Sequence, residues 1–221
     1  MGRVWNQASA GGKSGGQIHK MGKIFYIMGK SASGKDHIYE ALLRNSELGL
    51  SPLVLYTTRP IRKNEADGRE YHFVNEEKLV QLRLAGRLIE ERVYDTISGP
   101  WYYFTADEGQ IHLDTQDYLG IGTLESYESM RAYFGTEKVR PIYVETGDGI
   151  RLHRALRREE KQERPAYAEM CRRFLADCED FSEEKLHRAG IARRFENNGA
   201  LEDCLAEIAG YIVEVKNNAV S

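Results

Sequence analysis

The chain has 221 residues, of which 41% are hydrophobic and 29% are charged, as in an ordinary globular protein. Its 31 Lys and Arg against 34 Asp and Glu give a net charge of −3, which excludes a broadly basic nucleic-acid-binding protein. No apolar run reaches the ~18 residues of a membrane span, so we expect neither a nucleic-acid nor a membrane partner. The three widely spaced cysteines match no disulfide framework or zinc motif, and they indicate a reduced, cytoplasmic protein.

The first twenty residues differ in composition from the rest. Residues 1–20 are rich in Gly, Ser and Gln and contain no continuous apolar segment. This composition predicts a disordered leader or a cloning remnant rather than a secretory signal. We therefore expect the folded domain to cover residues 21–221.

The first elements of that domain follow one another closely. Lys23–Met28 is a short apolar run typical of a buried strand, and a glycine-rich loop and a helix follow it. Leu53–Thr58 is expected to be a second strand, preceded by a turn at Gly49–Pro52. Asn75 is the expected N-cap of a helix over residues 77–88.

Strands and helices then alternate along the chain. The pattern predicts strands at 89–94, 101–105, 118–122, 140–145 and 192–196, and helices at 124–134, 150–162, 166–179 and 200–216. This alternation predicts an α/β fold with a parallel sheet. Two stretches, 57–106 and about 150–180, are interpreted as insertions.

The glycine-rich loop fits the phosphate-binding pattern GxxxxGK. Its glycines allow the backbone N–H groups to turn toward phosphate oxygens, and the following helix N-terminus adds positive charge. Lys35 is expected to reach the β- and γ-phosphates. The predicted ATP phosphate-binding residues are Gly29, Lys30, Ser31, Ala32, Ser33, Gly34, Lys35 and Asp36.

The last position of this loop departs from the usual pattern. Serine or threonine commonly stands there and ligates Mg²⁺, whereas this chain has Asp36. A carboxylate can also bind Mg²⁺, directly or through water. Asp36 is therefore a candidate ligand for a Mg²⁺ cofactor.

A pair of arginines follows the second predicted strand. Arg59 and Arg62 stand three residues apart and are separated by Pro60, so they could form a rigid fork for an anionic group. Seen in isolation, such arginines more often belong to a solvated surface turn. A phosphate loop shortly upstream favours the anion-binding interpretation.

With these two segments, the sequence resembles the guanylate kinase family of nucleoside monophosphate kinases. The loop GKSASGK and the stretch TTRPIRKNEADGREYHFV carry the resemblance, which continues more weakly in Leu88–Glu90 and Tyr102–Thr105. The resemblance implies a P-loop kinase with a central parallel sheet flanked by helices. It further implies a monophosphate-binding insertion at 57–106, a helical lid at 150–180, and a core made of 21–56, 107–149 and 181–221.

The resemblance also implies roles for individual residues. The expected reaction transfers the γ-phosphoryl group of ATP to GMP or dGMP. Glu90 would accept hydrogen bonds from the guanine N–H groups, although Glu91 stands beside it. The acceptor-binding residues implied are Arg59, Arg62, Tyr71, Glu90, Tyr103 and Thr105.

Two departures from the family pattern concern the base and the metal. Leu55 stands where the family usually has a serine that contacts the base, and residues 118–125 lack the aspartates of the family's DxDxQG segment. Glu125 is a candidate substitute, and Asp36 is another. These changes leave open a kinase that acts on a different monophosphate or on a phosphorylated metabolite.

An arginine-rich stretch covers the expected lid. Its interleaved charges are compatible with a solvated helix face held by ion pairs. As a lid that closes over ATP, it would exclude water and bring arginines to the transferring phosphoryl group. By position, Arg158 and Arg173 resemble the family's lid arginines, so they join Lys35 as catalytic candidates.

A non-catalytic guanylate-kinase-like binding module is the remaining alternative. Such modules resemble the enzymes but have lost parts of the phosphate loop. The presence of Gly29, Gly34 and Lys35 argues against it, and the sequence gives no indication of the oligomeric state.

Overall fold

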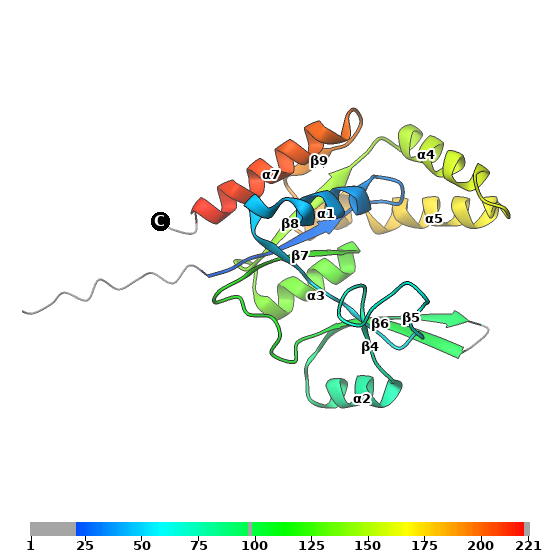
Figure 1. Cartoon of the computed structure of the whole chain (residues 1–221). Helices are drawn as coiled ribbons and strands as arrows, with labels where there is room; N and C mark the ends of the chain where they lie inside the picture. The colour runs from blue at the N-terminus through cyan, green and yellow to red at the C-terminus, as the bar shows by residue number, and fades with distance from the viewer. Residues whose placement is uncertain (1–20, 97–98, 219–221) are drawn as a thin grey trace, which may run out of the picture.

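The computed structural model describes residues 21–96 and 99–218 (Figure 1). The predicted leader, residues 1–20, lies outside the described residues. The three cysteines are free: Cys204 is buried, Cys178 is half-buried and Cys171 is exposed. Among the described residues, no helix is long and apolar enough to cross a membrane.

A five-stranded sheet forms the centre of the molecule. Its strand order is β2-β7-β1-β8-β9, and every pairing is parallel. These parallel strands alternate with helices along the chain, so the predicted α/β class is confirmed. The bounds are β1 (Ile24–Met28), β2 (Leu50–Pro52), β7 (Asp117–Gly122), β8 (Val139–Glu145) and β9 (Arg194–Glu196).

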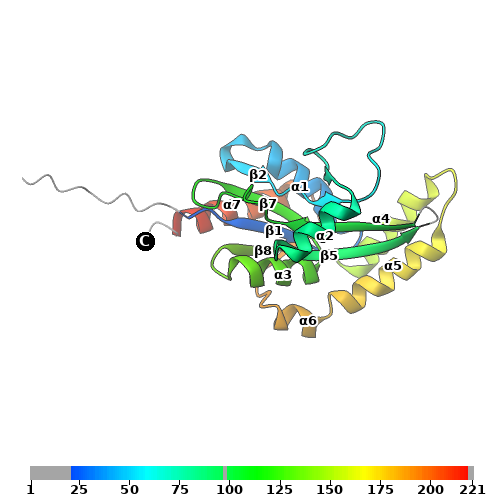
Figure 2. The same ribbon diagram turned by 90° about the horizontal axis from the view of Figure 1, so that it is seen from below.

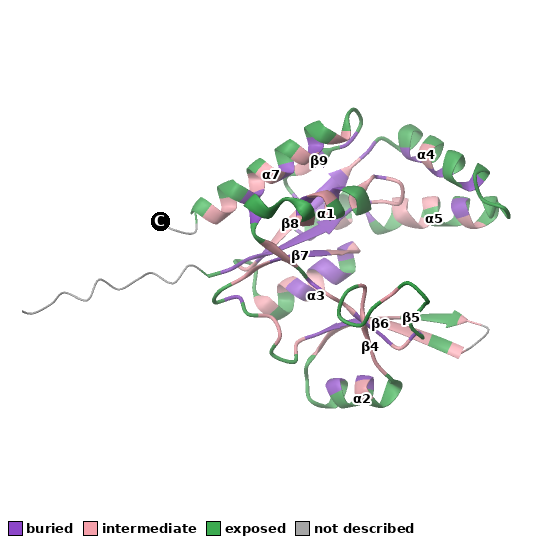
Figure 3. Ribbon diagram, in the orientation of Figure 1, coloured by how far each residue is buried: buried purple, intermediate pink, exposed green. Residues whose placement is uncertain are grey.

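Helices cover both faces of this sheet, because the buried strand β1 alternates its side chains between two cores. Phe25 and Ile27 pack with α1 (Lys35–Arg44) and α7 (Leu201–Asn218) on one face. Tyr26 and its neighbours pack with α3 (Leu124–Phe134) and α6 (Glu183–Arg188) on the other. Figure 3 shows the buried strands between these helix layers.

A second, four-stranded sheet forms a separate small core below the first in Figure 1. Its order is β4-β3-β6-β5, in which β5 (Leu88–Thr96) and β6 (Gly99–Ala106) form an antiparallel hairpin. The short strands β3 (Tyr56–Thr57) and β4 (His72–Phe73) pair in parallel. Helix α2 (Glu76–Leu84) contributes Leu79 and Leu82 to this core.

Two further helices, α4 (Asp148–Glu160) and α5 (Tyr167–Asp180), pack against each other. Figures 1 and 2 show them beyond the carboxyl ends of the central strands, on the same side as the β5–β6 hairpin. They occupy the stretch predicted as a lid. Parallel α/β sheets commonly bind ligands at this edge.

Two sequence predictions need correction. The single strand predicted at Leu53–Thr58 is wrong, because the chain crosses here from the central sheet to the second sheet. Strand β2 starts earlier, in the stretch predicted as a turn, and pairs with β7. Strand β3 pairs with β6.

The second correction concerns the helix predicted to end near residue 88. Helix α2 ends at Leu84, and Gly86 follows with a positive φ of 66°. Leu88 already belongs to strand β5. The predicted N-cap is confirmed, since the Asn75 side chain accepts a hydrogen bond from the Lys78 N–H at 2.9 Å.

Candidate functional site

The phosphate loop lies between β1 and α1. Two residues in left-handed conformations, Ala32 (φ 62°) and Gly34 (φ 92°), curl the loop so that α1 begins at Lys35. The Lys35 ammonium lies 3.4 Å from the carboxylate of Asp36, whose side chain is 75% exposed. This strand–loop–helix geometry places a lysine and backbone N–H groups at a helix N-terminus, where an anion is stabilised.

The loop is fastened by a residue that the sequence analysis missed. Asn197, which follows β9, donates a hydrogen bond to the Ser33 carbonyl at 2.7 Å, and Thr146 donates to the same carbonyl at 3.2 Å. A Cβ on Gly34 would come within 2.4 Å of the Asn197 amide nitrogen. The only sequence signal was a polar residue directly after a predicted strand.

The lid helices also contact this loop. The Ser31 N–H donates to the Asp177 carboxylate of α5 at 2.8 Å. Arg151 of α4 is fully buried and donates to the Ser31 carbonyl at 3.1 Å, while it pairs with Asp148. Lys30 lies 3.6 Å from Asp148. The position of the lid is therefore coupled to the phosphate loop.

The two predicted fork arginines lie in different environments. Arg59 is 4% exposed and donates two hydrogen bonds to Glu65, at 2.8 and 2.7 Å. Its guanidinium also lies 5.4 Å from the ring centres of Tyr71 and Phe73. Arg62 is exposed, and its backbone N–H donates to Glu65. Glu65 thus holds the Arg59 side chain in place, whereas it contacts Arg62 through the backbone N–H.

The bidentate contact with Arg59 holds the pKa of Glu65 well below its usual range, at about 2. Glu65 is thus charged at neutral pH and keeps the guanidinium fixed. A guanidinium that is already held in place can bind a phosphate without a further loss of side-chain conformational entropy.

The β5–β6 hairpin separates the two candidate base-reading glutamates. A register shift between Leu88 and Glu90 pairs Glu90 with Thr105, and the Thr105 hydroxyl donates to Glu90 at 2.9 Å. The Glu90 side chain is 7% exposed. Glu91 points to the other face and pairs with Arg83 of α2 at 2.7 Å. The structure therefore places Glu90, and not Glu91, on the inner face.

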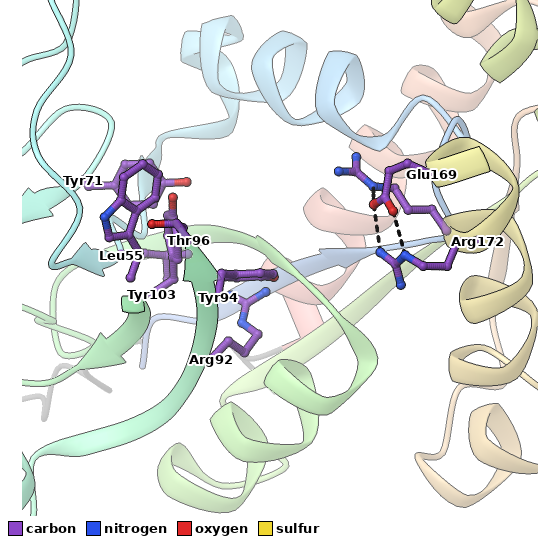
Figure 4. Close-up of a pocket in the computed structure, with 10 residues that line it drawn as sticks. Leu55, Tyr71, Arg92, Tyr94, Thr96, Tyr103, Glu169 and Arg172 are labelled. Carbon is purple, nitrogen blue, oxygen red and sulfur yellow. Dashed lines mark hydrogen bonds and ion pairs between the residues drawn. The ribbon is translucent and has the colours of Figure 1, made fainter. Parts of the chain in front are cut away.

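A cavity of about 680 Å³ lies between the second sheet and helix α5. Tyr71 and Tyr103, both predicted to bind the acceptor, line one wall, with their rings 5.6 Å apart edge to face. Arg172 and Arg173 line the opposite wall. Figure 4 shows the aromatic wall facing Glu169 and Arg172 across the cavity.

Two lid arginines connect this cavity to the phosphate loop. Arg173 lines both the 680 Å³ cavity and a neighbouring one of about 200 Å³, which Ser31 also lines. Arg158 lines that second cavity and a third of about 460 Å³, which contains Gly34 and Asp36. Arg158 and Arg173 thus each lie between two neighbouring cavities of this series.

The two metal candidates do not share a cavity. Asp36 lines the cavity next to Gly34. Glu125, in the first turn of α3, lines another with Arg92 and Lys185. Within residues 21–96 and 99–218, no group of three or more His, Cys, Asp or Glu could hold a metal ion by itself. Mg²⁺ is commonly held by one or two carboxylates together with substrate phosphates, and Asp36 fits that arrangement.

The structure shows what occupies the space near the missing aspartates. Strand β7 carries Gly120 and Gly122, and Tyr26 of the neighbouring β1 fills the space above them. A Cβ on Gly120 would come within 2.7 Å of the Tyr26 ring, and one on Gly122 within 2.3 Å of its hydroxyl. Burial raises the pKa of this hydroxyl, so it stays protonated. A side chain at either glycine is therefore incompatible with Tyr26.

Gly122→Ala is expected to lower the free energy of unfolding by about 1–3 kcal/mol, because overpacking forces core side chains to shift. Tyr26 is fully buried, so it cannot move aside freely. Adding Tyr26→Phe removes the nearest atom and should restore part of the loss. Urea denaturation measures both variants, with Gly210→Ala as the control because nothing lies within 4 Å of that position. A Gly122→Ala protein as stable as the wild type would contradict this packing.

Comparison with known proteins agrees with this geometry. The family model described as guanylate kinase matches residues 21–113. The guanylate kinase of Neisseria gonorrhoeae is 38% identical over 91 residues, which are 41% of this chain and 42% of that protein. The guanylate kinase of Bordetella pertussis is 41% identical over 70 residues, 31% of this chain and 32% of that protein. The similarity to guanylate kinases therefore lies in residues 21–113.

A solved structure extends the likeness in fold. The guanylate kinase from Anaplasma phagocytophilum superimposes with a TM-score of 0.56 and 18% identity, and the match covers 90% of this chain and 89% of that one. The chain therefore has the α/β fold of that guanylate kinase. The sequence matches themselves span about one third to two fifths of the length of these curated relatives. The matched segment contains the phosphate loop, the Arg59–Glu65 turn and the β5–β6 hairpin.

Proposed function

We propose that this protein is a guanylate kinase-like phosphotransferase, which transfers the γ-phosphoryl group of ATP to GMP or dGMP and gives ADP and GDP or dGDP. One observation carries the proposal: Arg158 and Arg173 each line two of three successive cavities that run from the phosphate loop to the Tyr71–Tyr103 wall. Donor and acceptor phosphates bound at the two ends would meet beside these arginines. The relatives named guanylate kinase support the same reaction.

On the acceptor side, Arg59 and Arg62 would hold the monophosphate together with the hydroxyls of Tyr71 and Tyr103. Arg59 is already fixed by Glu65. Glu90 would accept hydrogen bonds from the N1–H and N2–H groups of guanine, beside Thr105. A carboxylate matches that pair of donors and would repel the acceptor N1 of adenine.

On the donor side, the loop from Gly29 to Asp36 would hold the ATP phosphates, with Lys35 at the β- and γ-phosphates. Lys35, Arg158 and Arg173 would spread the negative charge that develops during transfer, which needs no covalent intermediate. Asp36 would hold Mg²⁺, which supplies charge neutralisation on the phosphates when bound. Closure of α4 and α5 would exclude water, so that the γ-phosphoryl group reaches the acceptor and not a water molecule.

The domain organisation is part of this proposal. We place the monophosphate-binding insertion at 57–106, the lid at 150–180 and the core in the rest of 21–221. The second sheet and helices α4 and α5 occupy those two stretches. The three free cysteines support a reduced, cytoplasmic location for the enzyme.

A coupled assay for ADP formation with a panel of monophosphates tests the proposal. We expect Mg²⁺-dependent turnover with GMP and dGMP, and at least about tenfold lower kcat/KM with AMP, CMP and UMP. Turnover of another acceptor in preference to GMP would overturn the assignment of the substrate. Absence of ATP binding in a calorimetric titration with Mg²⁺ would overturn the kinase assignment itself.

A further inference from the structure

The hairpin that carries Glu90 also carries a cation on the same face. Residues two apart on a strand point to the same side, so Glu90, Arg92 and Tyr94 of β5 share a face. Thr105, Tyr103 and Trp101 of β6 pair opposite them. Of these six residues, Arg92, Tyr94, Trp101 and Tyr103 line the 680 Å³ cavity.

Arg92 lies between the cavity and Glu90. Its Nε is 3.3 Å from the Glu90 carboxylate, and the Arg92 side chain is 26% exposed. Nε is buried and has no hydrogen-bond partner among the described residues. Figure 4 shows the guanidinium beside Tyr94 at the cavity wall. Since Nε is enclosed and faces Glu90, the outer N–H groups of the guanidinium are the ones that could reach a base edge in the cavity.

We propose that Arg92 is a specificity-determining residue that donates a hydrogen bond to the carbonyl oxygen of the acceptor base, next to Glu90. This inference rests on the proposed function. Leu55, on the same cavity, has no polar group in its side chain to offer that oxygen. Arg92 supplies such a group from β5, in the same sheet as β3, which Leu55 precedes.

The chemical match follows from the order of groups on the base. Guanine presents a carbonyl oxygen directly beside its N1–H donor, so an acceptor and a donor stand side by side on one edge. The hairpin presents a donor, Arg92, directly beside an acceptor, Glu90. Adenine presents an amino donor and a ring acceptor at the same positions. In adenine, the amino donor would therefore face Arg92, which is also a donor, and the ring acceptor would face Glu90, which is also an acceptor.

A thermodynamic cycle between Arg92 and the base oxygen tests the proposal. Binding of GMP, IMP and 6-thio-GMP is measured by calorimetry for the wild type and for Arg92→Ala. IMP keeps the oxygen and N1–H but lacks the amino group, and 6-thio-GMP replaces the oxygen with sulfur, a weaker acceptor. We expect Arg92→Ala to weaken GMP and IMP binding by roughly 10- to 100-fold. The loss for 6-thio-GMP should be several-fold smaller.

Arg83→Ala is the matched control, because Arg83 pairs with Glu91 on the opposite side of the same strand. It should leave all three affinities unchanged. Arg92→Lys, which keeps a charged donor, should restore part of the GMP affinity. Circular dichroism checks that each variant is folded.

Two results would overturn the inference while leaving the proposed function intact. In the first, the wild type binds GMP and the Arg92→Ala variant binds it equally well or more tightly. This result would mean that Arg92 only neutralises the charge of Glu90. The second is an equal loss for GMP and 6-thio-GMP. A wild type that binds neither GMP nor IMP would overturn the proposed function, and the inference with it.

Discussion

Lys35→Ala is expected to lower kcat for phosphoryl transfer at least about 100-fold, the usual cost of removing a preorganised group that stabilises transition-state charge. Lys35 begins helix α1 directly after the curled loop, so its ammonium and the helix N-terminus act on the same phosphates. The loss should fall mainly on kcat, because the backbone N–H groups of the loop remain to bind ATP. Steady-state kinetics with saturating ATP and GMP measure the effect.

Lys30→Ala is the matched control within the same loop. Lys30 lies 3.6 Å from Asp148 of α4 and is therefore directed toward the lid helix. We expect this variant to lose less kcat than Lys35→Ala, because the Lys30 ammonium is paired with Asp148 and alanine keeps the backbone N–H at this position of the loop. Equal losses in the two variants would mean that loop charge in general, and not Lys35 in particular, supports transfer.

Glu65→Gln is expected to raise the KM for the acceptor at least about tenfold and to lower the melting temperature. Glu65 receives two hydrogen bonds from the buried Arg59 and one from the Arg62 N–H. Glutamine keeps the shape but removes the charge, so a buried guanidinium loses its counterion, which is costly. Kinetics and thermal denaturation report the two effects separately.

Glu169→Gln provides the comparison. Glu169 also pairs with two arginines, Arg172 and Arg173, and this contact lowers its pKa to about 2. Those arginine side chains are 65% and 60% exposed, and exposed ion pairs contribute little to stability. We therefore expect Glu169→Gln to change the melting temperature much less than Glu65→Gln. An equal change would show that burial of Arg59 is not what makes its pair important.

The stability difference between wild type and Glu65→Gln should depend on pH in a defined direction. The pKa of Glu65 is lowered to about 2 in the folded protein, against about 4.3 in an unfolded chain. The contribution of the charged pair is therefore fully present above about pH 4.3 and is lost as the pH falls toward 2. Denaturation curves at pH 7 and pH 3 should show a smaller difference between the two proteins at the lower pH.

Local sequence signals predicted the elements whose partners are nearby in the chain. The phosphate loop, its flanking strand and helix, and the Asn75 cap are all signalled by residues a few positions apart, although distant residues such as Asn197 and Asp177 also hold the loop. Helix α3 occupies the predicted residues 124–134 for the same reason. By contrast, the apolar run LVLYTT gave no sign that its two ends belong to different sheets, because Leu53 bonds to Leu119 whereas Thr57 pairs with Tyr103.

The site was predictable as a set of residue types but not as an arrangement. Spacing identified Arg59 and Arg62 as a pair, yet their different burial follows from the turn that brings Glu65 to Arg59. The absence of aspartates from residues 118–125 was visible in the sequence, but the packing of Tyr26 against Gly120 and Gly122 was not. That required the register that sets Tyr26 opposite Gly120. Such long-range pairings are not encoded in local periodicity.

The central claim is that the phosphate loop and the cavity at Tyr71 and Tyr103 form one continuous site bridged by Arg158 and Arg173. A bisubstrate compound in which adenosine and guanosine are joined by a chain of five phosphates tests it most directly, in a competition titration against labelled ATP and labelled GMP. We expect one molecule of the compound per protein to displace both labelled nucleotides, with an affinity far above that of either. Displacement of only one of them, or independent binding of two molecules of the compound, would contradict a shared site.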